Sequence, residues 1–364
     1  MRSLIDAISI ARAALILPAD DLAAFHLHEL YRRQEQCSPL ATLIERSLGS
    51  PEFFSIVHSR AAFIKLADEE GIRVPKTQIL RTADQLKAWV EREGLPSVLK
   101  ADGTSGGEGV RVARTVEEAQ RAFQQLQKPP LLARACKRAL FDQDRTLIWP
   151  SLRRHRPTMN AQVFVAGHEA TSTIACWKGT VLASLHFEVL RKCSEAGHAT
   201  VVRLIENAEM SSAVEKIVRR MGLSGICGFD FMLEANTGNA FLIEINPRAT
   251  QVGHLTLGPG RDLPAAIYGA VSGDSARIAA AVTDNDTVAL FPHEWARDSQ
   301  SEFLRTGYHD VPWEAPELVN ACIQRGRQQS AWYSRDEVSR KLAVGCSPAK
   351  TPSERRTAAG IAAR

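Results

Sequence analysis

Residues 225–248, GICGFDFMLEANTGNAFLIEINPR, contain two apolar runs with high β propensity, separated by a short polar stretch. The runs are residues 227–234 and 240–246, and the Asn-Thr-Gly-Asn stretch at 236–239 has the residues of a tight turn. This pattern predicts a β-hairpin, and we expect the rest of the chain to be organised around it.

Each run of this hairpin carries one acidic residue. In antiparallel pairing about the turn, Asp230 and Glu244 fall near each other, and Asn246 follows Glu244 by two residues on the same face. Two carboxylates and an amide oxygen suit Mg²⁺ or Mn²⁺. Arg248, next on that face, supplies a planar cation for a phosphoryl or carboxylate group. An ordinary hairpin whose acidic side chains face water accounts for the pattern equally well.

A glycine-rich loop lies at residues 102–109, DGTSGGEG, between predicted strands at 96–101 and 110–113. Glycines let backbone N–H groups approach phosphate oxygens closely, because no Cβ blocks the approach, and such a loop can also close as a lid. The spacing fits neither the P-loop nor the dinucleotide-binding fingerprint. The alternative is a mobile surface turn.

Three segments of the chain resemble the ATP-grasp superfamily, which includes biotin carboxylase, carbamoyl phosphate synthetase and D-alanine:D-alanine ligase. They are SRAAFIKLADEEGIRVPKTQIL at 59–80, VLKADGTSGGEGVRVA at 98–113, and the hairpin with Asp-Phe-Met-Leu and Leu-Ile-Glu-Ile-Asn-Pro-Arg. The resemblance covers residues 56–271. In the superfamily a basic residue at the start of the first helix faces the phosphates, and Arg60 matches it; the alternative is an ordinary solvated arginine.

The resemblance also implies which residues bind the nucleotide and the metal. The implied nucleotide-binding residues are Arg60, Lys100, Thr104, Ser105, Gly106, Gly107, Gly109, Ile148 and Leu152. The implied catalytic residues are Lys100 and Arg248, and the metal ligands are Asp230, Glu244 and Asn246. Pro150 stands where the superfamily often has an acidic or polar residue beside the adenine, so only its apolar neighbours are assigned there.

The fold that these observations predict is α/β (α+β): an ATP-grasp fold in which two α+β subdomains grip ATP, at residues 56–150 and 151–275. A shortened α/β domain is expected at residues 1–55, with a strand at 13–17 and a helix from about 20 to 33 that turns Leu22, Phe25, Leu27 and Leu30 towards the core. Further strands are expected at 131–134, 146–149 and 288–291. Residues 276–346 are predicted to form an appendage and residues 347–364 a disordered tail.

The composition excludes several classes of protein. The 364 residues are 45% hydrophobic and 24% charged, with a net charge of only +4, which does not indicate a nucleic-acid partner. There is neither a signal-peptide pattern nor an apolar run of membrane-spanning length, and the seven cysteines include no C-x-x-C pair. We therefore expect a soluble cytoplasmic protein with free thiols and no membrane partner.

The predicted activity is ADP-forming ligation. ATP-grasp ligases phosphorylate a carboxylate to an acylphosphate, which an amine or another nucleophile then captures, so the expected partners are small-molecule carboxylates and nucleophiles. A carboxylase or phosphotransferase of the same fold would keep every residue named above, and a non-catalytic ATP-binding module is a third alternative. The sequence identifies neither the two substrates nor the oligomeric state.

Overall fold

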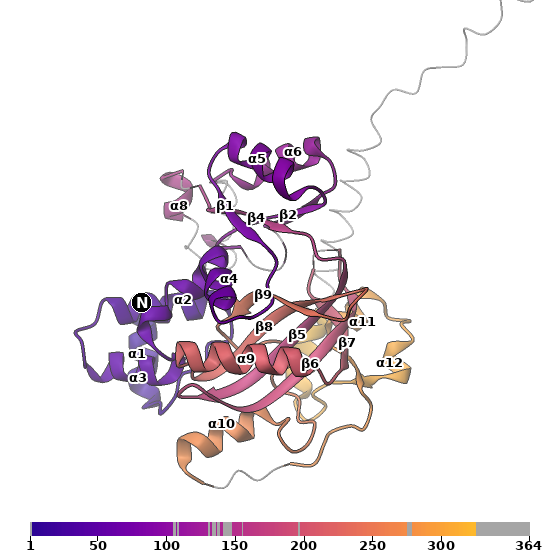
Figure 1. The fold of residues 1–364 in the computed structure, drawn as a ribbon. Coiled ribbons are helices and arrows are strands. Elements are labelled where there is room, and N and C mark those ends of the chain that lie inside the picture. Colours follow the sequence, from indigo (N-terminus) through magenta and orange to yellow (C-terminus); the bar gives the residue numbers. More distant parts are fainter. Residues whose placement is uncertain are drawn as a thin grey trace, which may run out of the picture.

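The fold consists of two antiparallel-rich sheets joined by a helix (Figure 1). The structure is a computed structural model and describes residues 2–324, apart from residues 105, 106, 108, 130, 131, 133–135, 137, 138, 141–147, 155, 196 and 275–278. The mixed α/β class predicted from the sequence is confirmed.

The smaller sheet has four antiparallel strands in the order β1-β4-β2-β3. Its strands are β1 (Thr77–Leu80), β2 (Ser97–Ala101), β3 (Val110–Ala113) and β4 (Met159–Val163), and its helices are α5 (Ala83–Glu93) and α6 (Val116–Leu126). Buried side chains such as Trp89 and Phe123 on these helices pack against Leu99 of β2. Thr82 and Thr115 cap the helices by accepting from the amides of the third following residue.

The larger sheet has seven strands in the order β11-β10-β7-β6-β5-β8-β9, so the predicted hairpin forms one edge. The strands are β5 (Gly167–Trp177), β6 (Thr180–Lys192), β7 (Ala199–Leu204), β8 (Gly225–Glu234), β9 (Ala240–Asn246), β10 (Thr287–Ala289) and β11 (Tyr308–His309). Helix α9 (Ala208–Met221) covers one face and α10 (Leu263–Ser272) covers the other. Ile174 and Ala175, adjacent on β5, belong to these two different cores because successive strand residues face opposite sides.

Helix α4 (Arg60–Glu69) connects the two sheets, since it contacts both β1 and β9. The hydroxyl of Ser59 caps it by accepting from the amide of Ala62 at 3.4 Å. The cap fixes where the helix begins, and Arg60 is its first residue.

The segment before α4 is helical. It contains α1 (Arg2–Ala11), α2 (Asp21–Arg32), α3 (Pro39–Leu48) and the short 3₁₀ turns η1 (Pro51–Phe53) and η2 (Ile56–His58). The strand predicted at 13–17 is wrong: this extended stretch has no sheet partner, and the amide of Ile16 donates instead to the hydroxyl of Ser47 at 3.0 Å.

The helix predicted from about 20 to 33 is confirmed as α2, but only part of its predicted core face is buried. Leu27 and Leu30 are 1% and 2% exposed. Leu22 and Phe25 are 36% and 43% exposed, so their predicted core positions are wrong. The buried stripe of α2 is narrower than its apolar residues suggest, because α3 covers only one side of it.

Later segments give mixed outcomes. The strand predicted at 288–291 is present as β10, and α11 (His293–Arg297) and α12 (Phe303–Thr306) follow it. The strand predicted at 146–149 is wrong, because Ile148–Leu152 forms the short helix α8. Pro150 explains this, since proline fits a first helical turn but cannot donate to a sheet ladder. The strand predicted at 131–134 lies almost wholly outside the described residues, and the tail at 347–364 lies wholly outside them.

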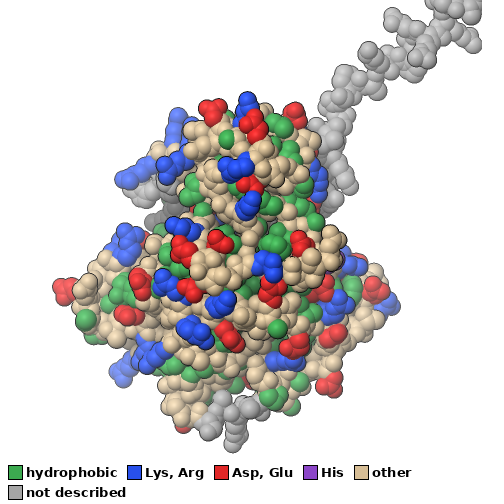
Figure 2. All heavy atoms as spheres, in the orientation of Figure 1, with side chains coloured by type: hydrophobic (Ala, Val, Ile, Leu, Met, Phe, Trp, Pro, Cys, Tyr) green, Lys and Arg blue, Asp and Glu red, His purple; other side chains and the backbone are tan. Residues whose placement is uncertain are grey.

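Two further expectations concern membrane-spanning segments and free thiols. No helix in the described part of the chain has the length and apolar character that crossing a bilayer requires. The cysteines within the described residues are free. On the face that Figure 2 shows, basic and acidic side chains are interspersed over the part of the molecule that contains the larger sheet.

Two glycines provide a matched test of how the N-terminal segment is docked. Gly49 ends α3 with φ 104° and Gly94 ends α5 with φ 80°. A Cβ at Gly49 would lie 2.7 Å from the carbonyl oxygen of Gly222, whereas a Cβ at Gly94 would meet nothing within 4 Å.

We expect Gly94→Ala to lower the free energy of unfolding by roughly 1–3 kcal/mol, the cost of a positive-φ backbone conformation that residues with a Cβ rarely adopt. Gly49→Ala should cost about 1–3 kcal/mol more, because backbone must also move. Urea denaturation of both variants measures the difference, and equal losses would contradict a tightly docked N-terminal segment.

Candidate active site

The predicted acidic pair is brought together by the register of the β8–β9 hairpin. Asp230 is paired with Glu244, and Gly228 with Asn246. The side-chain amide of Asn246 donates to Asp230 Oδ2 at 2.9 Å. The hairpin and the clustering of its three oxygen-bearing side chains are therefore as the sequence predicts.

Asp230 is held in an environment that disfavours its negative charge. The pKa of its carboxyl is raised from 3.8 to about 6, chiefly by burial and next by the charge of Glu244. Hydrogen bonds from Asn246 and Thr171 oppose this change. Two neighbouring carboxylates in a partly desolvated site are the arrangement that a bound cation would stabilise.

The glycine-rich turn closes on itself between β2 and β3. The hydroxyl of Thr104 donates to the carbonyl of Ala101 at 2.7 Å, and Ala101 in turn donates its amide to the carbonyl of Gly109 at 2.9 Å. A Cβ on Gly109 would lie 1.9 Å from Thr104 Oγ1, so only glycine fits there. Gly107 has φ 77°, while the predicted residues Ser105 and Gly106 lie outside the described residues.

Arg60 joins this turn to the hairpin. Its guanidinium donates to the carbonyls of Ala101 and Thr104 at 2.6 and 3.0 Å, and to Glu244 Oε1 at 2.9 Å. Its side chain is only 11% exposed, and it also lies 3.7 Å from Asp102 Oδ1. A solvated surface arginine is thereby excluded, and two of the predicted motifs meet at one side chain.

Lys100 lies on β2 within the same electrostatic cluster and is 6% exposed. The pKa of its ammonium group is lowered from 10.5 to about 8, chiefly by burial and to a lesser extent by the charge of Arg60. Glu244 and Asp230 act in the opposite direction. The lysine of the smaller sheet and the carboxylates of the larger sheet therefore face a common space.

Arg248 is held by a residue that the sequence analysis did not find. Strand β9 ends at Asn246, yet the Arg248 guanidinium reaches Asn246 Oδ1 at 3.2 Å. It also donates to both carboxylate oxygens of Asp21, through Nε at 2.7 Å and Nη2 at 3.4 Å. Asp21 opens α2, 227 positions earlier in the chain, so no local pattern could have indicated this pair.

Asp102 and Asn160 are two further polar residues of the site that sequence reasoning missed. Asn160 is the β4 partner of Lys100, and its amide donates to Asp102 Oδ1 at 2.8 Å. Burial raises the pKa of Asp102. Within the part of the chain that the structure describes, Asn160 Oδ1 and Arg60 Nε are buried without a hydrogen-bond partner, which is the state expected of groups that face a polar ligand.

The two residues predicted to contact the adenine belong to a short helix. Ile148 and Leu152 lie at the two ends of α8, and Leu152 is 55% exposed. Their contact with a nucleotide stays a prediction.

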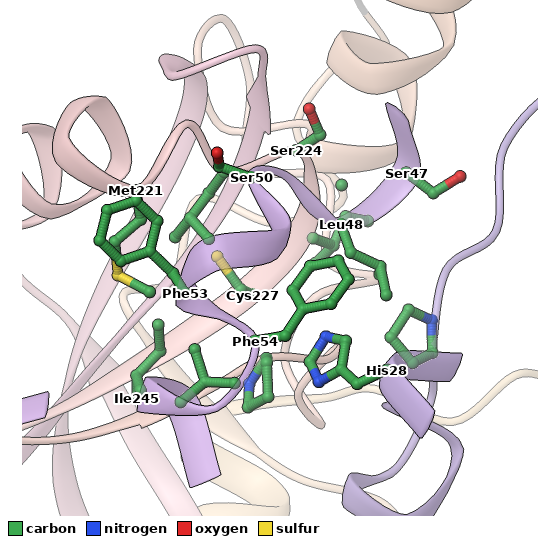
Figure 3. Close-up of a pocket in the computed structure, with 16 residues that line it drawn as sticks. His28, Ser47, Leu48, Ser50, Phe53, Phe54, Met221, Ser224, Cys227 and Ile245 are labelled. Carbon is green, nitrogen blue, oxygen red and sulfur yellow. The ribbon is translucent and has the colours of Figure 1, made fainter. Parts of the chain in front are cut away.

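A separate apolar cavity lies behind the hairpin, between the N-terminal helices and the larger sheet (Figure 3). Phe53, Phe54, Met221, Cys227 and Ile245 contribute to its wall. Ile245 alternates with Glu244 and Asn246 along β9, so the cavity is on the opposite face from the carboxylates. Its volume of about 20 Å³ suits a single water molecule rather than a nucleotide.

Comparison with known proteins identifies the fold family. Residues 59–257, more than half of the chain, match the family model of the carbamoyl-phosphate synthase L chain, ATP binding domain. The chain belongs to this family. The matched range contains Arg60, Lys100 and all of the hairpin, so the site described above, apart from Asp21, lies within an ATP binding domain of the ATP-grasp superfamily.

Individual relatives of this family match only parts of the chain. The carbamoyl phosphate synthase large chain of Methanosphaerula palustris is 26% identical over 207 residues, which is 56% of this chain and 18% of that relative. A phosphoribosylamine–glycine ligase of Ralstonia nicotianae is 33% identical over 106 residues, or 29% of this chain and 20% of that relative. The chain thus covers about a fifth of the length of these relatives.

Solved structures share the fold of this family at low sequence identity. The biotin carboxylase domain of the Hydrogenobacter thermophilus 2-oxoglutarate carboxylase has a TM-score of 0.53 and 18% identity, covering 77% of this chain and 58% of that one. Biotin carboxylase from Campylobacter jejuni has a TM-score of 0.50 and 17% identity, covering 76% and 55%.

The raised pKa of Asp230 gives a prediction about stability. Between pH 3.8 and about 6 the folded protein binds more protons at this group than the unfolded chain does, so this group makes stability fall as pH rises through that window. Asp230→Asn keeps an acceptor oxygen for Asn246 but removes the charge. Its melting temperature without ligand should exceed that of the wild type at pH 7 by about 2–4 °C, the shift that goes with about 1 kcal/mol.

The control for this prediction is Asp68→Asn, on the exposed side of α4, which should change little. Thermal denaturation between about pH 4 and pH 7 measures both variants. A lower melting temperature for Asp230→Asn at pH 7 would show that its charge is stabilising.

The lowered pKa of Lys100 gives a prediction about binding. Affinity for ATP with Mg²⁺ should fall as pH rises through about 8, because the free site then loses the ammonium charge that pairs with phosphate. Lys100→Arg should flatten this dependence, since guanidinium stays charged. Lys100→Ala should weaken binding at neutral pH by about 1.5–3 kcal/mol, the contribution of one charge-assisted hydrogen bond. Calorimetric titration measures each affinity, and unchanged binding by Lys100→Ala would refute the assignment.

Proposed function

We propose that this chain is an ADP-forming ligase that activates a carboxylate as an acylphosphate for capture by an amine or another nucleophile. The observation that carries the proposal is the convergence at Arg60. There the guanidinium of Arg60 donates to two backbone carbonyls, at the end of β2 and in the glycine-rich turn, and to the carboxylate of Glu244 on the larger sheet, all within 3.0 Å. This is the set of groups that phosphoryl transfer uses.

ATP and Mg²⁺ or Mn²⁺ suit the residues that are present. Asp230, Glu244 and Asn246 would hold the metal, because hard oxygen donors with one or two carboxylates are typical magnesium ligands. Among the described residues no three His, Cys, Asp or Glu side chains gather as a metal site, which agrees with a metal that takes its remaining ligands from water and phosphate. When bound, the metal neutralises charge on the transferred phosphoryl group.

The chain's own groups position the substrates. Lys100 in its protonated form and the buried Nε of Arg60 face the phosphates, and Arg248 holds the acceptor carboxylate. An oxygen of that carboxylate attacks the γ-phosphorus while the bond to the ADP oxygen breaks. The nucleophile then attacks the acyl carbon, phosphate leaves, and the amine gives up a proton.

The alternatives differ in what ADP release requires. A ligase releases ADP stoichiometrically with product only when carboxylate and nucleophile are both present, whereas a phosphotransferase needs no nucleophile and a binding module forms no ADP. The solved relative from Hydrogenobacter thermophilus contains magnesium ADP and bicarbonate, which supports inclusion of bicarbonate among the carboxylates to be screened. A screen of carboxylates and amines for ADP formation tests the proposal.

Glu244→Gln is the variant that addresses the proposed reaction most directly. It keeps an oxygen that can accept from Arg60 but removes the negative charge that would balance the positive charge of Mg²⁺. Activity should therefore fall by at least about a hundredfold, the scale of removing one electrostatic stabiliser. Folding should change little, because the amide oxygen can still accept from Arg60 and because repulsion between the carboxylates of Glu244 and Asp230 is relieved.

Glu234→Gln is the matched control, since Glu234 lies at the far end of the same hairpin and accepts from the Thr237 hydroxyl. ADP formation by the control should equal that of the wild type. Full activity in Glu244→Gln, with any substrate that the screen identifies, would rule out the metal site.

A further inference from the structure

The Asp21–Arg248 pair is open to solvent at the edge of the candidate active site. Its two partners come from α2 and from the end of β9, and they share contacts of 2.7 and 3.4 Å. The Asp21 side chain is 44% exposed and that of Arg248 is 23% exposed. A ligand can therefore reach both members without any movement of the core.

An apolar surface adjoins this pair. Phe25 follows Asp21 by four residues on α2, so the two side chains lie on the same side of the helix. Phe25 is 43% exposed and Leu22 is 36% exposed. The Phe25 ring packs edge-on against His58, with 5.5 Å between ring centroids, which fixes its position. A charged pair thus borders an exposed aromatic and aliphatic patch.

The cationic member of the pair is the one linked to the reaction centre. Arg248 donates to Asn246 Oδ1 at 3.2 Å, and Asn246 donates to Asp230 Oδ2 at 2.9 Å. Asp21 belongs to α2 and accepts from Nε of the guanidinium and from the same Nη2 that donates to Asn246. An anion at Arg248 would therefore be close to the metal ligands.

We propose that the Asp21–Arg248 pair binds an α-amino acid, whose carboxylate takes the place of Asp21 at Arg248 and whose ammonium group pairs with Asp21. The inference rests on the proposed function and names the class of its carboxylate substrate. A zwitterion satisfies both members, whereas a simple carboxylate leaves Asp21 unpaired and a simple amine leaves Arg248 unpaired. An unpaired, partly desolvated charge costs free energy, so the pair selects against both partial analogues.

The same arrangement orients the amino acid for the reaction. Its carboxylate lies at Arg248, next to Asn246, so a carboxylate oxygen accepts the γ-phosphoryl group as ADP leaves, and its ammonium group is held by Asp21. Its side chain lies over Phe25 and Leu22, which favours apolar amino acids. A separate amine then attacks the acyl carbon of the aminoacyl phosphate, phosphate leaves, and the amine gives up a proton as the amide bond forms.

The competing explanation is that the pair only ties α2 to the sheet. Arg220 and Glu70 form a comparable tie between elements, with Nε to Oε1 at 2.9 Å and side chains 47% and 31% exposed. This second pair lies between α9 and the end of α4. Glu70→Gln is therefore a control for loss of an ion pair as such.

The first experiment uses the wild-type chain with Mg²⁺ and a non-hydrolysable ATP analogue. After a thermal-shift screen of the twenty proteinogenic amino acids, calorimetry compares the best amino acid with its deaminated acid and its decarboxylated amine. For leucine these are 4-methylpentanoate and 3-methylbutylamine. We expect the amino acid to bind at least about tenfold more tightly than either analogue, on the scale of about 1.4 kcal/mol.

Variants then assign the selectivity to Asp21. Asp21→Asn should weaken amino-acid binding by at least about tenfold while the deaminated acid binds as well as before or more tightly, because no carboxylate repels it. Glu70→Gln should leave both affinities unchanged. Should Asp21→Asn fail to fold, the wild-type comparison of the three ligands still decides.

Three outcomes would overturn the inference: no binding by any amino acid, equal affinity for the amino acid and its deaminated acid, or unchanged amino-acid affinity in Asp21→Asn. The proposed function is tested separately by nucleotide binding and by ADP formation with other carboxylates. Turnover with acids that lack an amino group, without turnover of amino acids, would retain the ligase and refute the amino-acid site.

Discussion

The guanidinium of Arg60 is the group on which the assembly of the site depends. It binds two carbonyls of the glycine-rich turn and one carboxylate of the hairpin, so a single side chain holds together parts of two different sheets. Only arginine has a planar fork of donors that can reach partners in several directions at once. A buried cation needs such partners, and Glu244 and Asp102 supply the balancing charge.

Burial of the site also shifts the pKa values of its charged side chains away from their ordinary values. Lys100 and Asp230 have pKa values of about 8 and about 6, and in each case removal from water is the largest cause. Both shifts disfavour the charged form that binding needs. Phosphate would favour the charged lysine, and a metal would favour the charged aspartate, so ligand binding and the full ionisation of the site are linked.

The parts of the site that the sequence predicts are those set by local register. The hairpin fixes Asp230 opposite Glu244 through its turn, and the Ser59 cap fixes Arg60 at a helix start. The missed parts depend on tertiary contacts: Asp21 reaches Arg248 across 227 positions, and the exposure of Phe25 depends on what packs beside α2. Periodicity alone treats an exposed apolar residue as a core residue, because it does not show whether a partner covers that face.

That exposed face also changes how the N-terminal segment is interpreted. Phe53, Phe54 and the backbone at Gly49 pack closely against the rear of the hairpin and the end of α9, so the segment is anchored on one side. Helix α2 is thereby held with Asp21 at the front of the hairpin, beside Arg248. The apolar packing of the N-terminal segment against the rear of the hairpin therefore also fixes the position of the Asp21 carboxylate beside Arg248. The N-terminal helices, which lie outside the residues that match the family, therefore contribute directly to the environment of the site.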